Sequence, residues 1–111
     1  MELEFQHKTI WAGDFNCWCN PSRDRYPAAE RPAIGFKKFQ DFQDYFNLTD
    51  SCNLDKEKKY NYTRHNIWQG KIVSSTRIDY FLLPISFHDL QINLQTLPCH
   101  VFDHMELACS L

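Results

Sequence analysis

The strongest periodic pattern in the chain lies between residues 36 and 46. Phe36, Phe39, Phe42 and Phe46 recur at steps of three and four residues, with charged and amide side chains between them. This spacing places the rings on one face of an amphipathic helix of about three turns. We interpret the rings as core packing rather than as a ligand site, and Asn47 predicts the end of the helix.

Strands are predicted before and after this helix. The apolar run at residues 9–12 is rich in strand formers and ends at Gly13, which indicates a buried strand. Residues 60–65 alternate between two faces, and Gly70 marks a turn before a second strand that runs from about residue 72 to residue 83. These two strands are the arms of a predicted hairpin.

The C-terminal third of the chain predicts two further strands. Pro84 ends the second arm of the hairpin, and residues 85–89 are typical of one short turn. Residues 90–95 alternate between apolar and amide side chains, as a half-buried strand does. A last strand is expected after residue 104, with alternate residues from Met105 onward on one face.

Together these elements predict a sheet-dominated α+β fold of the layered α/β sandwich kind, with one main helix and about six strands in a mostly antiparallel or mixed sheet. The chain has 111 residues, 43% of them hydrophobic, which suits one core and one domain over residues 1–111. Residues 21–32, with three prolines, predict a long polar loop. No apolar run approaches the roughly 20 residues of a bilayer span, so we expect no membrane association.

The charge along the chain is uneven. The formal net charge is -2, but residues 56–77 hold six basic residues against one glutamate, which gives that segment +5 and the remainder -7. A phosphate-facing loop on an otherwise acidic body would have this distribution, and so would one solvated face of a hairpin. For the first interpretation, the candidate nucleic-acid contacts are Lys58, Lys59, Arg64, Lys71 and Arg77.

Five cysteines exclude a complete disulfide framework, because one thiol must remain unpaired. Reduced thiols in an intracellular compartment, nuclear or cytoplasmic, fit this count best, and most of them are expected to act as small buried hydrophobic groups. One alternative is a zinc module built from Cys17, Cys19 and Cys99 with either His100 or His104, although this spacing resembles no common closed site.

Three polar elements interrupt the apolar strands. They are the GDFN segment at residues 13–16, the RIDYFL segment at residues 77–82, and the Asp103-His104 pair. Charged side chains at the ends of strands are costly to bury and therefore require an explanation. Taken singly, each has a structural interpretation: Asp14 as the cap of a turn, Asp79 as half of a buried ion pair with a neighbouring basic residue, and the Asp-His pair as surface.

In this order, the three elements resemble the C-terminal half of the endonuclease/exonuclease/phosphatase family, in particular the apurinic-type endonuclease domain of non-LTR retrotransposons. The similarity also takes in the aromatic helix, the LTD segment at residues 48–50 and the Tyr62-Thr63 pair. It spans nearly the whole chain, and the RIDYFL strand is its most specific element. The resemblance implies metal-dependent hydrolysis of a DNA phosphodiester as the function and DNA as the partner.

The resemblance also implies a role for five residues. Asp14 resembles the carboxylate that orients or deprotonates the attacking water, and Asn16 resembles the amide that hydrogen-bonds the scissile phosphate. Asp79 resembles the carboxylate that fixes the catalytic imidazole of His104, and Asp103 resembles a metal-site carboxylate. Such hydrolysis needs a positioned water, donors aimed at the developing charge, and a hard cation such as Mg²⁺ (or Mn²⁺). These side chains are therefore expected to converge in one pocket.

The family's domain is a sandwich of two sheets, and this chain resembles only the second half. The Asn and Glu that the first half supplies near the metal have no candidate here, and an apolar sheet face is left for a second chain, a second copy or another segment to cover. The chain also departs from the family at Phe102, where the family has Ser, and at Arg64, which replaces an aromatic residue. The alternative function is a non-catalytic remnant that binds nucleic acid or a partner chain through its sheet face.

Overall fold

A computed structural model describes residues 9–55, 57–58, 60–89, 92–97 and 104–110. In this part of the chain the strands are β1 (Trp11–Asp14), β2 (Arg25–Tyr26), β3 (Leu48–Asp50), β4 (Arg64–Trp68), β5 (Lys71–Thr76), β6 (Asp79–Pro84), β7 (Asn93–Leu97) and β8 (Glu106–Ser110). The helices are α2 (Phe36–Tyr45) and the short 3-10 helices η1 (Ser51–Asn53) and η2 (Ile85–Asp89). The fold is therefore α+β, as expected, and its strands form three small antiparallel sheets in the orders β1-β6-β3, β2-β5-β4 and β7-β8.

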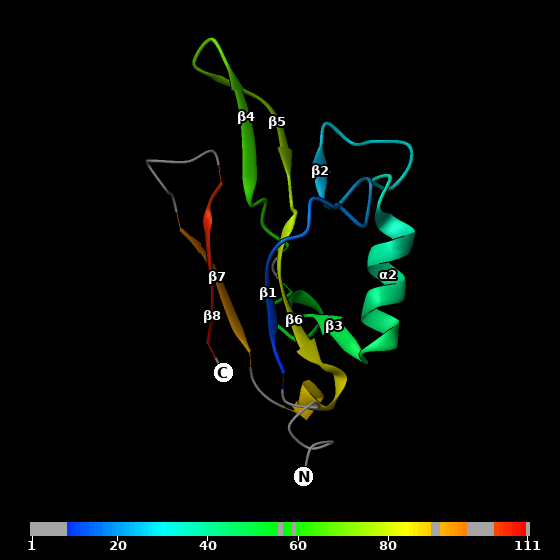
Figure 1. The fold of residues 1–111 in the computed structure, drawn as a ribbon. Coiled ribbons are helices and arrows are strands. Elements are labelled where there is room, and N and C mark those ends of the chain that lie inside the picture. The colour runs from blue at the N-terminus through cyan, green and yellow to red at the C-terminus, as the bar shows by residue number, and fades with distance from the viewer. Residues whose placement is uncertain (1–8, 56, 59, 90–91, 98–103, 111) are drawn as a thin grey trace.

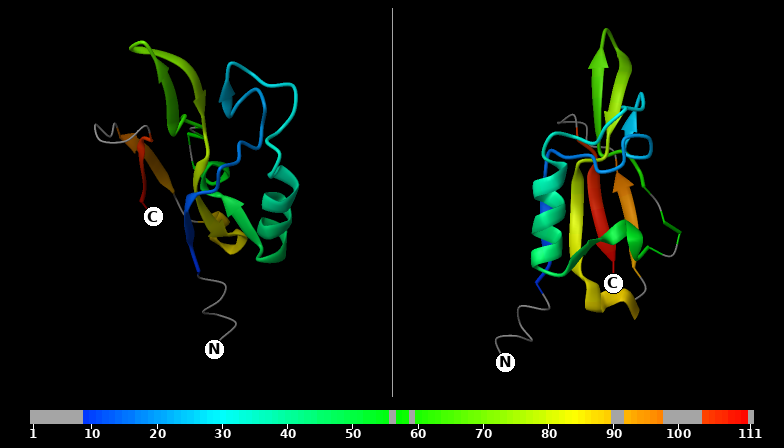
Figure 2. Two further views of the ribbon diagram at one scale, coloured as in Figure 1. Left: turned by 45° about the horizontal axis from the view of Figure 1, so that its top comes forward. Right: turned by 90° about the vertical axis from the view of Figure 1, so that its right-hand side faces the viewer.

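The sheet β1-β6-β3 lies between two layers, with α2 on one face and the β7-β8 pair on the other (Figure 1 and Figure 2). Its central strand, β6, contributes to both cores because successive side chains of a strand point to opposite faces. Tyr80 and Leu82 pack with Phe39 of α2, whereas Leu83 packs with Leu94 of β7. Asp79, the charged residue at the start of β6, therefore lies on a strand held between two packed layers.

The predicted aromatic helix is confirmed. Phe39 is buried, and its ring centroid lies 5.0 Å from that of Tyr80 on the sheet. Such ring pairs contribute about 0.5–1.5 kcal/mol beyond the area they bury. The helix ends where predicted, because Asn47 has a φ of 54°, a left-handed conformation that cannot continue an α-helix and that Asn tolerates better than most residues.

The predicted hairpin is present as β4 and β5 and projects away from the layered body (Figure 1), but its first arm covers residues 64–68 rather than the predicted 60–65. Its tip is a two-residue turn in which Gln69 and Gly70 have φ values of 50° and 75°. Two consecutive positive φ values define a type I′ turn, the turn whose twist matches that of the flanking strands. Glycine meets this requirement at the second position without strain.

The strand predicted over residues 72–83 is wrong as one element, because it is divided between two sheets. β5 ends at Thr76 and β6 begins at Asp79, with Arg77 and Ile78 between them. The backbone N–H of Arg77 donates to the carbonyl of Asp24, and that of Ile78 donates to the hydroxyl of Thr63. These bonds replace the ladder that one continuous strand would have made.

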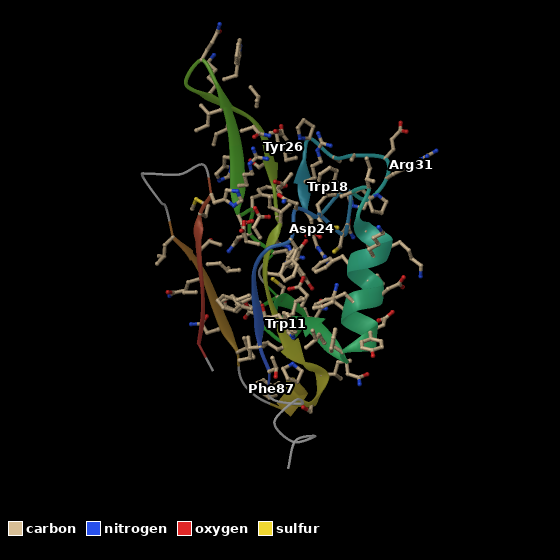
Figure 3. All side chains as sticks on the ribbon, viewed as in Figure 1. Trp11, Trp18, Asp24, Tyr26, Arg31 and Phe87 are labelled. Atoms are coloured by element: carbon tan, nitrogen blue, oxygen red, sulfur yellow. The ribbon has the colours of Figure 1, made fainter. Side chains whose placement is uncertain are left out.

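The strand predicted at residues 9–12 overlaps β1, which begins at Trp11 and continues through Gly13 to Asp14, and the prediction that it is buried is wrong. All four of its residues are exposed, because β1 is an edge strand of its sheet and pairs with β6 alone. Trp11 still covers the end of α2, with its ring 5.2 Å from Phe42 and 5.8 Å from Phe46 (Figure 3). Neither α2 nor either 3-10 helix of the described residues is long and apolar enough to cross a bilayer.

Candidate active site

Asp14, Asp79 and His104 meet at one end of β1 and β6. Asp14 is the last residue of β1 and Asp79 is the first of β6, and the two face each other across the antiparallel ladder. His104 lies just before β8, with its Nδ1 2.8 Å from Asp79 Oδ2 and its Nε2 3.7 Å from Asp14 Oδ2. The structure thus brings together three of the residues that were predicted to converge.

The imidazole of His104 is held in one orientation between the two carboxylates. An ionised carboxylate can only accept a hydrogen bond, so the Nδ1–H of His104 donates to Asp79 and Nε2 faces Asp14. Directly opposed like charges in a ladder repel each other, and the ring's hydrogen bond offsets part of that cost. The side chains of Asp14, Asp79 and His104 are 37%, 18% and 28% exposed, which leaves the group accessible to a substrate.

Asp14 is oriented by the turn that follows β1. Its Oδ1 accepts a hydrogen bond from the backbone N–H of Asn16 at 2.8 Å, so the other oxygen is the one presented to His104. Asn16 has a φ of 51° and is exposed. The described hydrogen bond of Asn16 is made by its backbone N–H, to Asp14, and not by its side-chain amide. The predicted hydrogen bond from that amide to the scissile phosphate therefore stays a prediction.

Thr63 ties together the segments that carry the site. Its Oγ1 accepts hydrogen bonds from the backbone N–H groups of Ile78 and Asp79, each at 3.1 Å, and its carbonyl accepts one from the N–H of Met105 at 2.6 Å. Thr63 is 1% exposed, so water does not compete for these bonds. The sequence pattern gave Thr63 no role of its own, because a threonine within an alternating run has no local signal for three long-range contacts.

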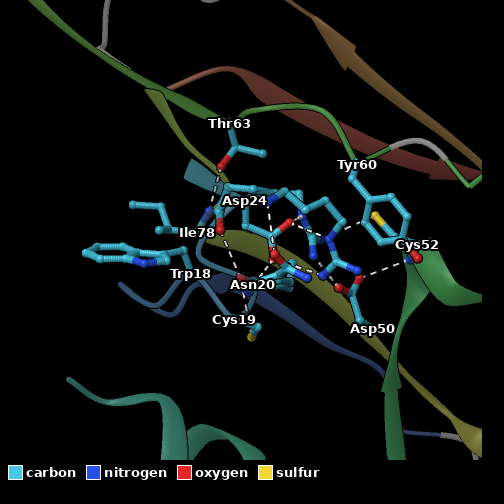
Figure 4. Close-up of polar contacts among 12 residues, drawn as sticks. Trp18, Cys19, Asn20, Asp24, Asp50, Cys52, Tyr60, Thr63 and Ile78 are labelled. Carbon is cyan, nitrogen blue, oxygen red and sulfur yellow. Dashed lines mark hydrogen bonds and ion pairs between the residues drawn. The ribbon is translucent and has the colours of Figure 1, made fainter. Parts of the chain in front are cut away.

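Arg77 is not a nucleic-acid contact, and that prediction is wrong. Its side chain is 2% exposed, its Nε donates to Asp24 Oδ1 at 2.8 Å, and its Nη2 lies 2.7 Å from Asp50 Oδ2. Figure 4 shows Asp24 and Asp50 within this buried cluster. A guanidinium enclosed by two carboxylates cannot reach a phosphate in solution. Instead, Arg77 joins the loop that contains Asp24 to β3. It does so only two residues before Asp79 in the sequence.

The buried cluster has the electrostatics of a structural network. Burial alone would raise the pKa of Asp24, but hydrogen bonds from Arg23 and Arg77 outweigh it and lower that pKa to about 2. Burial alone would lower the pKa of Arg77, but the charges of Asp50 and Asp24 hold it above its ordinary value. Both groups therefore stay ionised at neutral pH and bind each other rather than a ligand.

The other basic candidates lie at different places on the chain. Arg64 begins β4 and forms an isolated antiparallel bridge with His104, so its backbone adjoins the site. Lys71 is exposed beside the turn of the hairpin. Lys58 is exposed in the loop after η1, where its Nζ donates to the carbonyl of Asn53 at 3.2 Å. Lys59 lies outside the described residues.

The donor atoms of the site suit a divalent cation. Within the described ranges, the group of metal-ligating side chains whose donor atoms lie within 4.8 Å of one another is Asp14, Asp79 and His104. Two carboxylates and one imidazole can hold a divalent metal. The predicted metal carboxylate, Asp103, lies outside the described residues, as do Cys99 and His100 of the zinc alternative. The thiols of Cys17 and Cys19 belong to no such group in the described part of the chain.

No protein-family model matches the chain, and no curated protein matches it. The assignment of a function to the site therefore depends on the chemistry and geometry of its residues.

Proposed function

We propose that the chain is a phosphodiesterase domain that hydrolyses DNA with Mg²⁺ (or Mn²⁺), an endonuclease of the type found in non-LTR retrotransposons. The observation that carries this proposal is the convergence of Asp14, Asp79 and His104 from three separate segments. A buried ion pair would explain Asp79 alone. It would not explain an imidazole oriented by one acid and directed at another on an accessible surface.

Each of the three side chains has a task in the chemical step of the proposed reaction. Asp79 fixes the ring and the tautomer of His104, as a carboxylate does in hydrolytic triads. His104, when protonated, donates from Nε2 to the phosphate oxygen on which negative charge develops. Asp14 accepts a proton from the attacking water and directs the water's oxygen toward phosphorus. As the new P–O bond forms, the bond from phosphorus to the leaving sugar oxygen breaks, and solvent water protonates that oxygen. The 3.7 Å between Nε2 and Asp14 Oδ2 is too long for a hydrogen bond between them, so both atoms can turn to a substrate.

The carboxylates present fit the proposed cation. Mg²⁺ is commonly held by one or two carboxylates, several waters and substrate phosphate oxygens, and exposed Asp14 can supply such a carboxylate. Asp103 is the second predicted ligand and stays a prediction. When bound, the cation would neutralise charge on the phosphate. Asp79 is less available as a ligand, because one of its oxygens is engaged by His104.

DNA would be held by charges beside the site. Arg64 adjoins His104, and Lys71 is exposed at the tip of the hairpin, so both can meet phosphates of a duplex whose scissile bond lies at His104. Lys58 would add to this contact from the loop before β4, and the contact predicted for Lys59 falls outside the described residues. Binding through such residues is sensitive to salt and largely indifferent to sequence.

The proposed compartment is intracellular and reducing, in the nucleus or the cytoplasm. Cys17, Cys19 and Cys52 are reduced thiols in the structure. Burial raises the pKa of Cys17 and that of Cys52 to about 12, so at neutral pH both are protonated and act as small hydrophobic groups. Thiols in this state are compatible with an environment that forms no disulfides.

The test is nicking of a supercoiled plasmid by the purified chain in Mg²⁺. We expect nicking that requires the metal and that is lost in His104→Ala. His65→Ala is the matched control, because the Nδ1 of His65 is hydrogen-bonded to Ser75 Oγ and not to an acid. Equal nicking by His104→Ala and the parent chain would assign the cleavage to a contaminant and contradict the proposal.

The second candidate function is a non-catalytic remnant that binds nucleic acid or a partner chain. It is favoured by an open groove of about 260 Å³ beside Asp79, lined mostly by apolar residues of β1, β6 and β8 that include Ala12, Phe81 and Leu107. A partner chain, a second copy or another segment would cover this groove. Salt-sensitive DNA binding without any cleavage, or a stable dimer in solution, would favour the remnant over the enzyme.

A further inference from the structure

We propose that Asp14 and His104 form a binding site for a transition-metal ion of the zinc class, and that zinc bound there blocks the hydrolytic site. The carrying observation is the 3.7 Å separation between His104 Nε2 and Asp14 Oδ2. The binding step depends only on this geometry. The blocking step rests on the proposed function.

The distance between His104 Nε2 and Asp14 Oδ2 fits two ligands of one metal ion better than it fits a direct hydrogen bond. Zn²⁺ binds imidazole nitrogen and carboxylate oxygen at about 2.0–2.2 Å, so ligands 3.7 Å apart would subtend about 125° at the metal. That angle lies near the tetrahedral and trigonal values that zinc accepts. A direct hydrogen bond would need the two atoms about 0.7 Å closer.

Both ligands are already oriented by a second partner. The Nδ1–H of His104 donates to Asp79 at 2.8 Å, the carboxylate–histidine arrangement that fixes the tautomer and makes Nε2 a better metal ligand. The backbone N–H of Asn16 engages Asp14 Oδ1 and leaves Oδ2 for the ion. With two protein ligands, the site keeps positions open for water, so we expect weaker binding than in a closed structural zinc site.

The ligand set selects the class of metal. An imidazole nitrogen beside a carboxylate favours zinc and its neighbours over Mg²⁺, which prefers oxygen ligands and keeps its waters. Zinc on Nε2 would remove the proton-donating atom that the proposed hydrolysis uses, and would occupy Asp14 at the same time. The same two side chains would therefore support hydrolysis in Mg²⁺, whereas zinc bound to them would inhibit it.

The direct test is calorimetric titration of the reduced, metal-free chain with Zn²⁺, without DNA. We expect one site whose affinity falls at least tenfold in His104→Ala and about 10–100-fold in the nearly isosteric Asp79→Asn, which removes the orienting charge and leaves Nε2 in place. The control variant is His65→Ala, whose affinity should equal that of the parent chain. Urea unfolding of each variant establishes that it is folded.

Cobalt distinguishes this site from the cysteine thiols. Co²⁺ bound to Asp14 and His104 gives visible absorption without a thiolate charge-transfer band, and that absorption should vanish in His104→Ala. Equal zinc affinity of the parent chain and His104→Ala, a thiolate band, or no binding at millimolar Zn²⁺ would each overturn the proposal. If the chain binds zinc and cleaves no DNA, the metal site stands and the proposed hydrolysis fails. If zinc binds at this site and leaves Mg²⁺-dependent cleavage unchanged, the blocking step is wrong.

Discussion

Replacing Arg77 by methionine separates two explanations of the basic segment. The charge pattern along the chain places Arg77 among the phosphate contacts, whereas the structure buries it between Asp24 and Asp50. Arg77→Met keeps much of the side-chain volume and removes the charge. If the structural role is correct, the variant loses stability while its folded form keeps its affinity for DNA.

The loss of stability in Arg77→Met depends on the hydrogen bonds that Asp24 and Asp50 keep without the guanidinium. Removing one partner of a buried ion pair costs about 3–5 kcal/mol, because a buried charge is left uncompensated. Asp24 keeps its bonds from Arg23 and from the backbone N–H of Asn20, and Asp50 keeps the N–H of Cys52. We therefore expect about 3 kcal/mol, at the low end of that range, against a total stability of about 5–15 kcal/mol.

The assay is urea unfolding followed by tryptophan fluorescence. With a denaturant dependence of about 1–3 kcal/mol per molar urea, the midpoint of Arg77→Met should fall by about 2 M. Lys37→Ala is the control, because its pair with Asp41 lies on the exposed surface of α2 and should leave the midpoint unchanged. An unchanged midpoint for Arg77→Met, with weakened DNA binding, would refute the structural role of Arg77.

Three further predictions concern pH, the support of the site, and salt. The pKa of folded Asp24 lies at about 2, below its ordinary value of 3.8, so the ionised carboxylate contributes about 2 kcal/mol to the free energy of unfolding above pH 4. This stability should be lost as the pH falls toward 2, and acid unfolding monitored by circular dichroism measures the loss. Thr63→Val removes the acceptor of one buried and one part-buried N–H group, so we expect about 2 kcal/mol of destabilisation and slower plasmid nicking. Thr63→Ser keeps the hydroxyl and should retain the parent stability and nicking rate, and equal effects of the two substitutions would contradict the role of Thr63. Lys71→Ala should weaken DNA binding alike for all sequences and reduce the salt slope by about one, and an unchanged slope would remove Lys71 from the interface.

The local sequence pattern predicted the helix and the turns that are determined by residues close together in the sequence. The three- and four-residue steps from Phe36 onward identified α2, and Asn47 and Gly70 identified a helix end and a hairpin turn through their tolerance of positive φ. The exposure of β1 was missed, because an apolar run does not reveal whether its strand lies at the edge or the centre of a sheet.

The rest depends on contacts between residues distant in the sequence. Arg77 bonds to Asp24 across 53 positions, and no periodicity reports such a partner, so the division of the long strand and the burial of its arginine were not foreseen. The approach of Asp79 and His104 was predicted from the family resemblance and is present in the structure. Their roles in catalysis stay predictions.

The most direct test of the central claim is the plasmid-nicking rate of Asp79→Asn in Mg²⁺, compared with the parent chain and His65→Ala. Asparagine keeps the shape of the site but no longer offers a charged acceptor to His104 Nδ1, so the ring loses its fixed tautomer. Loss of the orienting carboxylate in a hydrolytic triad lowers turnover by up to about 10⁴-fold. We predict a fall of at least about 100-fold for Asp79→Asn, with His65→Ala unchanged. A nicking rate for Asp79→Asn equal to that of the parent chain would contradict the account.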